Sequence, residues 1–233
     1  MPPSCSGAPE AGLLPQRSVL ASQVYDYLRT EIVSLRIGPG RNIRIRALGQ
    51  RLGVSEIPVR EALQQLVQRG LVETQPHIGF RVRRLSIQEV GDVFDARILV
   101  EDHALAASGS KWDAAVLGEF LSEIERLEDR LATSDQTAWL RDVDRIEHMM
   151  HGRLLCEKTD NHVIRRFLET MADLAAITRH LVLAPSLAQE EHKRILLALM
   201  DKDVLRARHE LRAHLERAKR DTLAGLGELE DPQ

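Results

Sequence analysis

The chain has 233 residues, of which 43% are hydrophobic and 29% charged, a balance typical of a globular protein rather than a disordered or fibrous one. It has no run of about 18 apolar residues, so no segment is expected to cross a membrane. The net charge of −3 hides an asymmetry, because residues 1–84 carry 12 arginines and 6 acids while residues 85–233 carry 20 basic and 29 acidic residues. This asymmetry indicates a nucleic-acid-binding module on a regulatory or dimerising body, although solvated surface charge would give the same composition.

The N-terminal segment is rich in Pro, Gly and Ser and lacks both the basic start and the apolar core of a secretion signal. We therefore expect a disordered tail over residues 1–17. The two cysteines, Cys5 and Cys156, cannot build a disulfide framework, which favours a reducing cytoplasm. Aromatic residues make up only 3% of the chain, so aliphatic side chains must fill the core, and this favours helices.

Residues 18–84 are expected to form a small domain of three helices and a hairpin. Apolar residues recur at helical spacing, and Gly53 is placed to end the second helix. Ser55 is a good N-cap for the third helix, and Pro58 fits its first turn, where a missing N–H costs little. The expected elements in chain order are helices 19–35, 45–52 and 55–69 and β-strands 71–74 and 80–82.

This order of helices followed by a two-stranded wing is that of a winged helix-turn-helix domain. Residues 46–63 read Arg-Ala-Leu-Gly-Gln-Arg-Leu-Gly-Val-Ser-Glu-Ile-Pro-Val-Arg-Glu-Ala-Leu and closely resemble the GntR family of bacterial transcription regulators. The Gly38-Pro39-Gly40 turn and the wing at residues 76–80 resemble the same family. The resemblance covers about residues 19–84 and implies a DNA-binding domain.

By this resemblance, the residues that contact operator DNA are Arg46, Ser55, Glu56, Arg60, His77 and Gly79. A recognition helix meets the major groove with its first turn, where free N–H groups attract phosphate. Arg60 can then reach a guanine edge or the backbone, Arg46 approaches from the preceding helix, and the wing tip enters the minor groove. Each residue also has an ordinary alternative, since a lone Arg is usually solvent-exposed and Ser55 would cap a helix in any protein.

Glu56 departs from the pattern, because many relatives place Arg directly after the Ser. A carboxylate repels phosphate but accepts a hydrogen bond from cytosine. We therefore expect the operator to differ from that of the Arg-bearing relatives.

From residue 85 onward the pattern stays helical, and an all-α antiparallel bundle is expected over residues 85–224. No β-alternation is found in this part, and the acidic tail 225–233 is expected to be frayed. The expected helices are 87–108, 112–132, 136–158, 161–183, 186–200 and 203–224.

Three features of this body resemble the FCD ligand-binding domain of the FadR subfamily: Arg97-Ile-Leu-Val-Glu101, the helix start at Asn161, and the Glu191-His192 pair followed by His214. The resemblance covers most of residues 87–222. It implies a divalent metal ion held by an Asp and three His, with a small carboxylate effector bound to the metal.

For the metal, the predicted ligands are Asp144, His148, His192 and His214, with His151 as an alternative ligand. Asp144 and His148 reproduce the family's spacing of an Asp followed by a His four residues later. Counting back from Asn161 without a gap, however, puts Gly152 in the His position and His148 in the Asp position, so the two registers disagree. A mixed imidazole and carboxylate set suits Zn, Ni, Mn or Fe. A helix-rich chain with nine histidines will also place some on one face by chance.

Arg97 can clamp an effector carboxylate through its planar guanidinium, or it can pair with Glu101 one turn later.

Together, these features predict a cytoplasmic transcription regulator, a repressor, which binds a palindromic operator as a homodimer and responds to a small organic acid. One alternative is an effector-independent DNA-binding protein whose body only dimerises. The other is a metal-dependent hydrolase on a DNA anchor, which is disfavoured because no separate nucleophile and base are recognisable.

Overall fold

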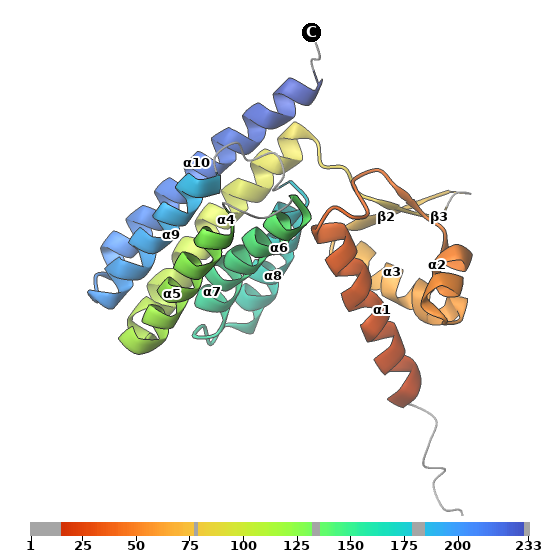
Figure 1. Cartoon of the computed structure of the whole chain (residues 1–233), viewed down its shortest axis with the longest axis horizontal. Coiled ribbons are helices and arrows are strands. Elements are labelled where there is room, and N and C mark those ends of the chain that lie inside the picture. Colours follow the sequence, from red (N-terminus) through yellow and green to blue (C-terminus); the bar gives the residue numbers. More distant parts are fainter. Residues whose placement is uncertain (1–14, 77–78, 132–135, 179–184, 231–233) are drawn as a thin grey trace, which may run out of the picture.

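The computed structural model describes residues 15–76, 79–131, 136–178 and 185–230, which form a winged-helix lobe followed by a helical bundle (Figure 1). No helix within these ranges is long and apolar enough to span a membrane. The elements of the winged-helix lobe are α1 (Pro15–Val33), β1 (Asn42–Ile43), α2 (Ile45–Leu52), α3 (Glu56–Gln68), β2 (Val72–Gln75) and β3 (Gly79–Val82).

The lobe has a helical core backed by a three-stranded antiparallel sheet with the strand order β1-β3-β2. Gly53 adopts the left-handed conformation that ends α2, with φ +68°. Leu28, Leu63 and Leu66 are fully buried where α1 packs on α3. This packing fixes α3 beneath the sheet and leaves the opposite face of α3 toward solvent.

The bundle begins at a capping box, in which the Ser86 hydroxyl and the Glu89 carboxylate each accept a hydrogen bond from the other residue's backbone N–H. The elements of the bundle are α4 (Ile87–Ser108), η1 (Gly109–Lys111), α5 (Ala114–Leu131), α6 (Gln136–Glu147), η2 (His148–Arg153), α7 (Leu154–Cys156), α8 (His162–Ala176), α9 (Pro185–Met200) and α10 (Val204–Glu230). The fully buried Trp112 donates its ring N–H to the carbonyl oxygen of Leu154 at 3.1 Å, which ties the connection between η1 and α5 to α7.

The fold class is the expected one, mostly helical with a small β-wing, but three details differ from the sequence analysis. The helix expected over residues 136–158 is interrupted by a π-helical turn, η2. The C-terminal helix does not end at residue 224 but reaches Glu230, so the first six residues of the expected frayed tail are helical. Gly225, at the start of that segment, is buried. At the other end, α1 starts inside the expected disordered tail, at Pro15, a residue suited to a first helical position.

One helix of the bundle, α8, also packs against the winged-helix lobe (Figure 1). Near its C-terminal end, Asp173 accepts a hydrogen bond from Nε of Arg29 on α1 at 2.8 Å. Arg69, at the end of α3, lies 3.2 Å from the carboxylate of Glu169. Just beyond α8, Ile177 is buried in the core of the winged-helix lobe. The helix therefore belongs structurally to both parts of the chain.

Candidate DNA interface and metal centre

The arginines of the winged-helix lobe fall into two groups. Six are paired within the chain: Arg29 with Asp173, Arg36 with Glu31, Arg51 with Tyr27, Arg69 with Glu169, Arg81 with Glu73 and Arg83 with Glu89. Five others are exposed, and their side chains have no hydrogen-bond or ion-pair partner among the described residues: Arg84, after the wing, and Arg41, Arg44, Arg46 and Arg60. The last four lie on or beside β1, α2 and α3, so their charge is available to an external anion on that side of the lobe.

The first turn of α3 presents an unusual set of side chains to the outside. Ser55 occupies the N-cap position with an extended backbone, but its hydroxyl makes no capping hydrogen bond. Glu56 and Arg60 are both exposed. Between them, Ile57 is 52% exposed, an apolar side chain that the sequence analysis did not single out. This turn can offer a hydroxyl, a carboxylate, an aliphatic group and a guanidinium to a DNA groove.

Of the two wing residues predicted to contact DNA, Gly79 begins β3 with φ +109°, a conformation that L-residues rarely adopt. A side chain at this position would strain the backbone, which explains a glycine at the base of the wing. His77 lies outside the described residues.

In the bundle, three buried histidines meet: His151 from η2, His192 from α9 and His214 from α10. Nε2 of His151 lies 3.2 Å from Nε2 of His214 and 3.3 Å from Nε2 of His192. One ring nitrogen from each residue fits within a group whose members are at most 4.8 Å apart. The three histidines are at most 3% exposed, so the protein shields their rings from bulk water.

The other ring nitrogen of each histidine faces an acceptor. Nδ1 of His151 lies 2.6 Å from Oε2 of Glu101, and Nδ1 of His214 lies 2.7 Å from Oε2 of Glu191. Nδ1 of His192 lies 3.3 Å from Oε1 of Gln189. With the proton held on Nδ1 in each ring, the three Nε2 lone pairs converge on one point. Convergent lone pairs repel one another unless a cation lies between them, so this donor set fits a metal ion.

Burial favours the neutral form of two of the imidazoles, and neighbouring positive charge keeps the Glu101 carboxylate ionised. Burial lowers the pKa of His192 and of His214, and neighbouring imidazoles add to the effect. Burial alone would raise the pKa of Glu101, but Arg97 and His151 outweigh it and lower that pKa to about 2. Metal ligation requires neutral imidazole, so the lowered pKa values of His192 and His214 favour binding of a cation.

The carboxylate that faces the histidines is Glu147. Its Oε2 lies 3.7 Å from Nε2 of His151, and its Oε1 lies 3.7 Å from Nε2 of His192. Glu147 precedes His151 by four residues, so the pair has the expected acid-to-histidine spacing with Glu in place of Asp. That spacing was visible in the sequence and was missed because Asp144 and His148 satisfy it with the expected acid.

Asp144 and His148 are not part of the cluster, which corrects their expected placement. His148 is exposed, and Asp144 lies close enough to Arg29 to help raise the pKa of that guanidinium. The cause is the π-helical turn, which holds one more residue per turn than an α-helix. This extra residue turns His151 inward. It also explains why the count back from Asn161 arrives at Gly152, one residue after His151, as the position of the metal-binding His.

Arg97 is buried and donates from Nε to Oε1 of Glu101 at 2.7 Å. Of the two expected roles, pairing with Glu101 is the one that the structure contains. Because Glu101 also binds His151, Arg97 is linked to the histidine cluster through one carboxylate. The roles of Glu101 and Glu191 as partners of His151 and His214 were not predicted, since only the packing of separate helices brings them to those rings. Gln189 was also missed, although it precedes His192 by three residues on the same helix.

The chain matches two family models: residues 20–82 match the bacterial regulatory proteins of the gntR family, and residues 92–217 match the FCD domain. The protein therefore belongs to the GntR family of bacterial regulatory proteins, in the subfamily with a C-terminal FCD domain.

Among its relatives, the chain is 29% identical over 203 residues to the transcriptional repressor GlaR of Escherichia coli, a match that covers 82% of this chain and 90% of GlaR. It is 30% identical to an HTH-type regulator from an unstable DNA locus of Streptomyces ambofaciens, covering 82% of this chain and 80% of that protein. The fold is similar to that of E. coli McbR/YncC, with a TM-score of 0.75 and 20% identity over 91% of this chain and 99% of that one. A GntR regulator from Rhodococcus sp. RHA1 gives a TM-score of 0.72 at 21% identity, over 88% and 97% of the two chains.

Proposed function

We propose that this GntR-family regulator is a repressor whose operator affinity is set by a small carboxylate bound at a divalent metal in the FCD domain. The observation that carries this proposal is the convergence of three Nε2 atoms, from His151, His192 and His214, in the buried cluster. A repressor role is supported by the relative GlaR, which is named as a repressor and is similar over 82% of this chain. We propose no enzymatic role.

The metal would be held by the three histidines, with the Glu147 carboxylate as the acidic ligand. Such a set of imidazoles and one carboxylate suits Zn, Ni, Mn or Fe. The bound ion would supply positive charge for an effector carboxylate. Arg97 pairs with Glu101, which in turn hydrogen-bonds His151 of the cluster. We propose that the positive charge of Arg97 favours binding of the same effector carboxylate.

For DNA, we propose that the domain over residues 18–84 uses Arg46, Ser55, Glu56 and Arg60, with the wing at His77 and Gly79. Two copies of the chain, joined through the domain over residues 85–224, would place two winged-helix lobes on a palindromic operator. Because the target is chromosomal DNA, we propose that the protein acts in the cytoplasm.

The coupling between the two sites would pass through α8. This helix packs against η2, which carries His151, and its far end contacts Arg29 and Arg69 of the winged-helix lobe. An effector that changes the position of η2 would thereby change how the lobe is held. It can alter operator affinity only to the extent that it binds the two arrangements with different affinities.

The test compares the variants His151→Ala and His148→Ala, which remove the same side chain from neighbouring positions of η2. After loading with Zn, Ni or Mn and removal of free metal, we expect about one metal per chain in wild type and in His148→Ala, and a large loss in His151→Ala. Operator binding is then measured for the loaded wild type against a set of small carboxylic acids. At least one acid is expected to change the affinity by about 5- to 150-fold, the range of ordinary allosteric coupling.

Two results would contradict the proposal. Equal metal content in all three proteins would exclude the histidine cluster as the site. If metal is bound but no acid changes operator affinity or melting temperature, the body is a dimerisation bundle and the regulator does not depend on an effector.

A further inference from the structure

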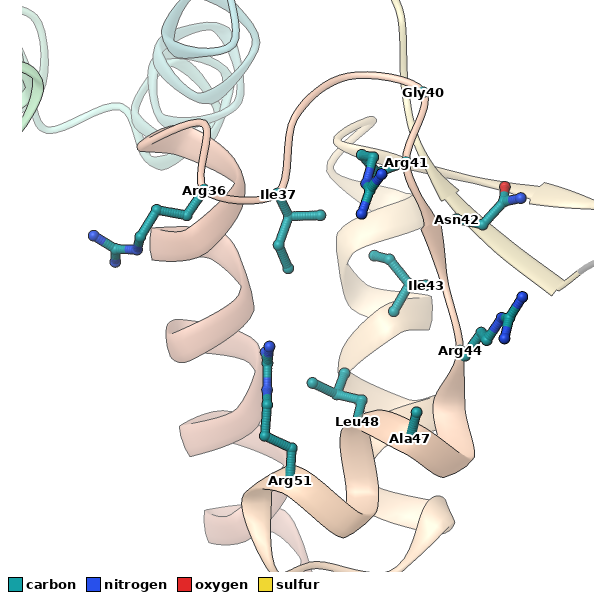
Figure 2. Close-up of a pocket in the computed structure, with 10 residues that line it drawn as sticks. All are labelled: Arg36, Ile37, Gly40, Arg41, Asn42, Ile43, Arg44, Ala47, Leu48 and Arg51. Atoms are coloured by element: carbon teal, nitrogen blue, oxygen red, sulfur yellow. The ribbon is translucent and has the colours of Figure 1, made fainter. Parts of the chain in front are cut away.

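A cavity of about 640 Å³ lies in the winged-helix lobe, between the end of α1, β1 and one face of α2 (Figure 2). Four arginines line it, together with an apolar floor and no acidic side chain. The lining residues are Arg36, Ile37, Gly40, Arg41, Asn42, Ile43, Arg44, Ala47, Leu48 and Arg51. An excess of cationic groups without any carboxylate among the lining residues marks this cavity as a place for an anion.

The four arginines do not point the same way. Figure 2 shows the side chains of Arg41 and Arg51 directed into the hollow from opposite sides, while Arg36 and Arg44 point outward. Two guanidinium groups that face one hollow can share the oxygens of a single tetrahedral anion.

The two inward arginines differ in how they are held. Arg51 donates to the hydroxyl of Tyr27 at 3.1 Å and lies over the Tyr27 ring at 5.8 Å, so two contacts with Tyr27 orient its guanidinium toward the hollow. Arg41 is exposed and has no side-chain partner among the described residues. Arg36, by contrast, is paired with Glu31 outside the hollow. The cavity therefore holds one oriented guanidinium and one unpaired guanidinium.

We infer that Arg41 and Arg51 form a phosphate-binding site, and that its occupant is a phosphate of the operator backbone. This inference rests on the proposed function and adds a contact that the recognition helix does not make. The occupant follows from position, because Arg44 and Arg46 lie at the start of the same helix, both exposed and unpaired. In a helix-turn-helix domain the helix before the recognition helix crosses the DNA backbone, and here that helix is α2.

The first experiment compares Arg41→Ala with Arg36→Ala, which removes the same charge from the same cavity at a side chain that points outward. Operator duplex is obtained by selection from a random pool, and dissociation constants are measured over a series of salt concentrations. Each phosphate contact contributes a slope of about −0.9 to log K against log salt. Arg41→Ala is expected to reduce that slope by about one per half-site and to weaken binding to operator and random duplex alike. Arg36→Ala is expected to leave the slope close to that of wild type.

The second experiment locates the phosphate by replacing single operator phosphates with neutral methylphosphonates. At one position in each half-site, the replacement is expected to weaken wild-type binding several-fold and to have no further effect on Arg41→Ala. Such non-additivity would show that Arg41 contacts that phosphate.

The outcomes separate this inference from the function on which it rests. If wild type binds operator with steep salt dependence but Arg41→Ala behaves as Arg36→Ala does, the phosphate site is overturned and the proposed function stands. If wild type binds no duplex, the proposed function is rejected, and so is the assignment of an operator phosphate to this cavity. If free pyrophosphate raises the melting temperature of wild type but not of Arg41→Ala, while operator binding is unaffected by the variant, the cavity takes a free anion and not the DNA backbone.

Discussion

Asp173 on α8 and Arg29 on α1 form an ion pair that joins the two lobes across 144 residues of sequence. The carboxylate is 3% exposed and the guanidinium 32% exposed, so the pair lies at the edge of the interface rather than in its centre. Ile177, only four residues further along the chain, is buried in the core of the winged-helix lobe. The ion pair therefore marks the point at which the bundle and the DNA-binding lobe are held together.

Replacing this carboxylate in Asp173→Asn should lower the free energy of unfolding by about 1–3 kcal/mol, because Arg29 loses its charged partner but remains partly hydrated. Urea denaturation measures the change. Asp160→Asn is the matched control, since Asp160 is 94% exposed in its pair with Lys111 and surface pairs of this kind contribute little. Equal losses in the two variants would show that the interface does not depend on this pair.

Acid stability should depend on Asp102, which joins α4 to α10 by accepting hydrogen bonds from Arg208 and Arg212. These two guanidinium groups hold the pKa of Asp102 far below its ordinary value of 3.8. Because the pKa is lower in the folded state, the stability from this group is complete above pH 3.8 and is lost as the pH falls below it.

We therefore expect Asp102→Asn to be less stable at neutral pH and to lose less stability on acidification than wild type. Urea midpoints measured from pH 7 down to pH 3 give both quantities. Asp95→Asn serves as the control, because Asp95 joins the same two helices through Lys219 but is 62% exposed. A parallel decline of Asp102→Asn and wild type with pH would contradict the assignment.

Metal affinity should depend on Glu101 although it is not expected to touch the metal. Its carboxylate accepts from Nδ1 of His151 and so keeps Nε2 free for ligation. Glu101→Gln is expected to weaken metal binding by about 10- to 100-fold, the usual effect of removing such a partner. Competition with a chelator measures the affinity, and Glu157→Gln, at an exposed residue paired with Arg153, controls for the loss of one negative charge. An unchanged affinity in Glu101→Gln would mean that this hydrogen bond does not orient the ligand.

Base preference should depend on Ile57, whose exposed side chain stands between Glu56 and Arg60 on the first turn of α3. An aliphatic group in the major groove can contact the C5-methyl group of thymine. Replacing the contacted thymine by deoxyuridine should weaken wild-type binding by about two- to fourfold, since burying one methyl group contributes about 0.8 kcal/mol. Ile57→Ala should bind the two duplexes equally. Sensitivity to uracil that persists in Ile57→Ala would assign the methyl contact to another residue.

Much of the architecture was predictable because its signals are local. The spacing of apolar residues, Gly53 after α2 and Pro58 in the first turn of α3 each act over a few residues, and the winged-helix elements form close to where they were expected. The residues predicted to face DNA come from the resemblance to the GntR family and stay a prediction. What the spacing could not reveal is which arginines are already paired, because Arg29 and Arg69 find their acids more than 90 residues away.

The buried histidine cluster shows most clearly which features the sequence determines and which depend on the tertiary structure. The sequence by itself determined that His192 and His214 come from two helices of the bundle and that an acid and a histidine four residues apart precede them. Only the tertiary structure decided between His148 and His151, because one extra residue in a helical turn rotates the following side chains by about 100°. Since η2 must pack against α8 and face α9 and α10, the inward residue is His151, and the acid that accompanies it is Glu147.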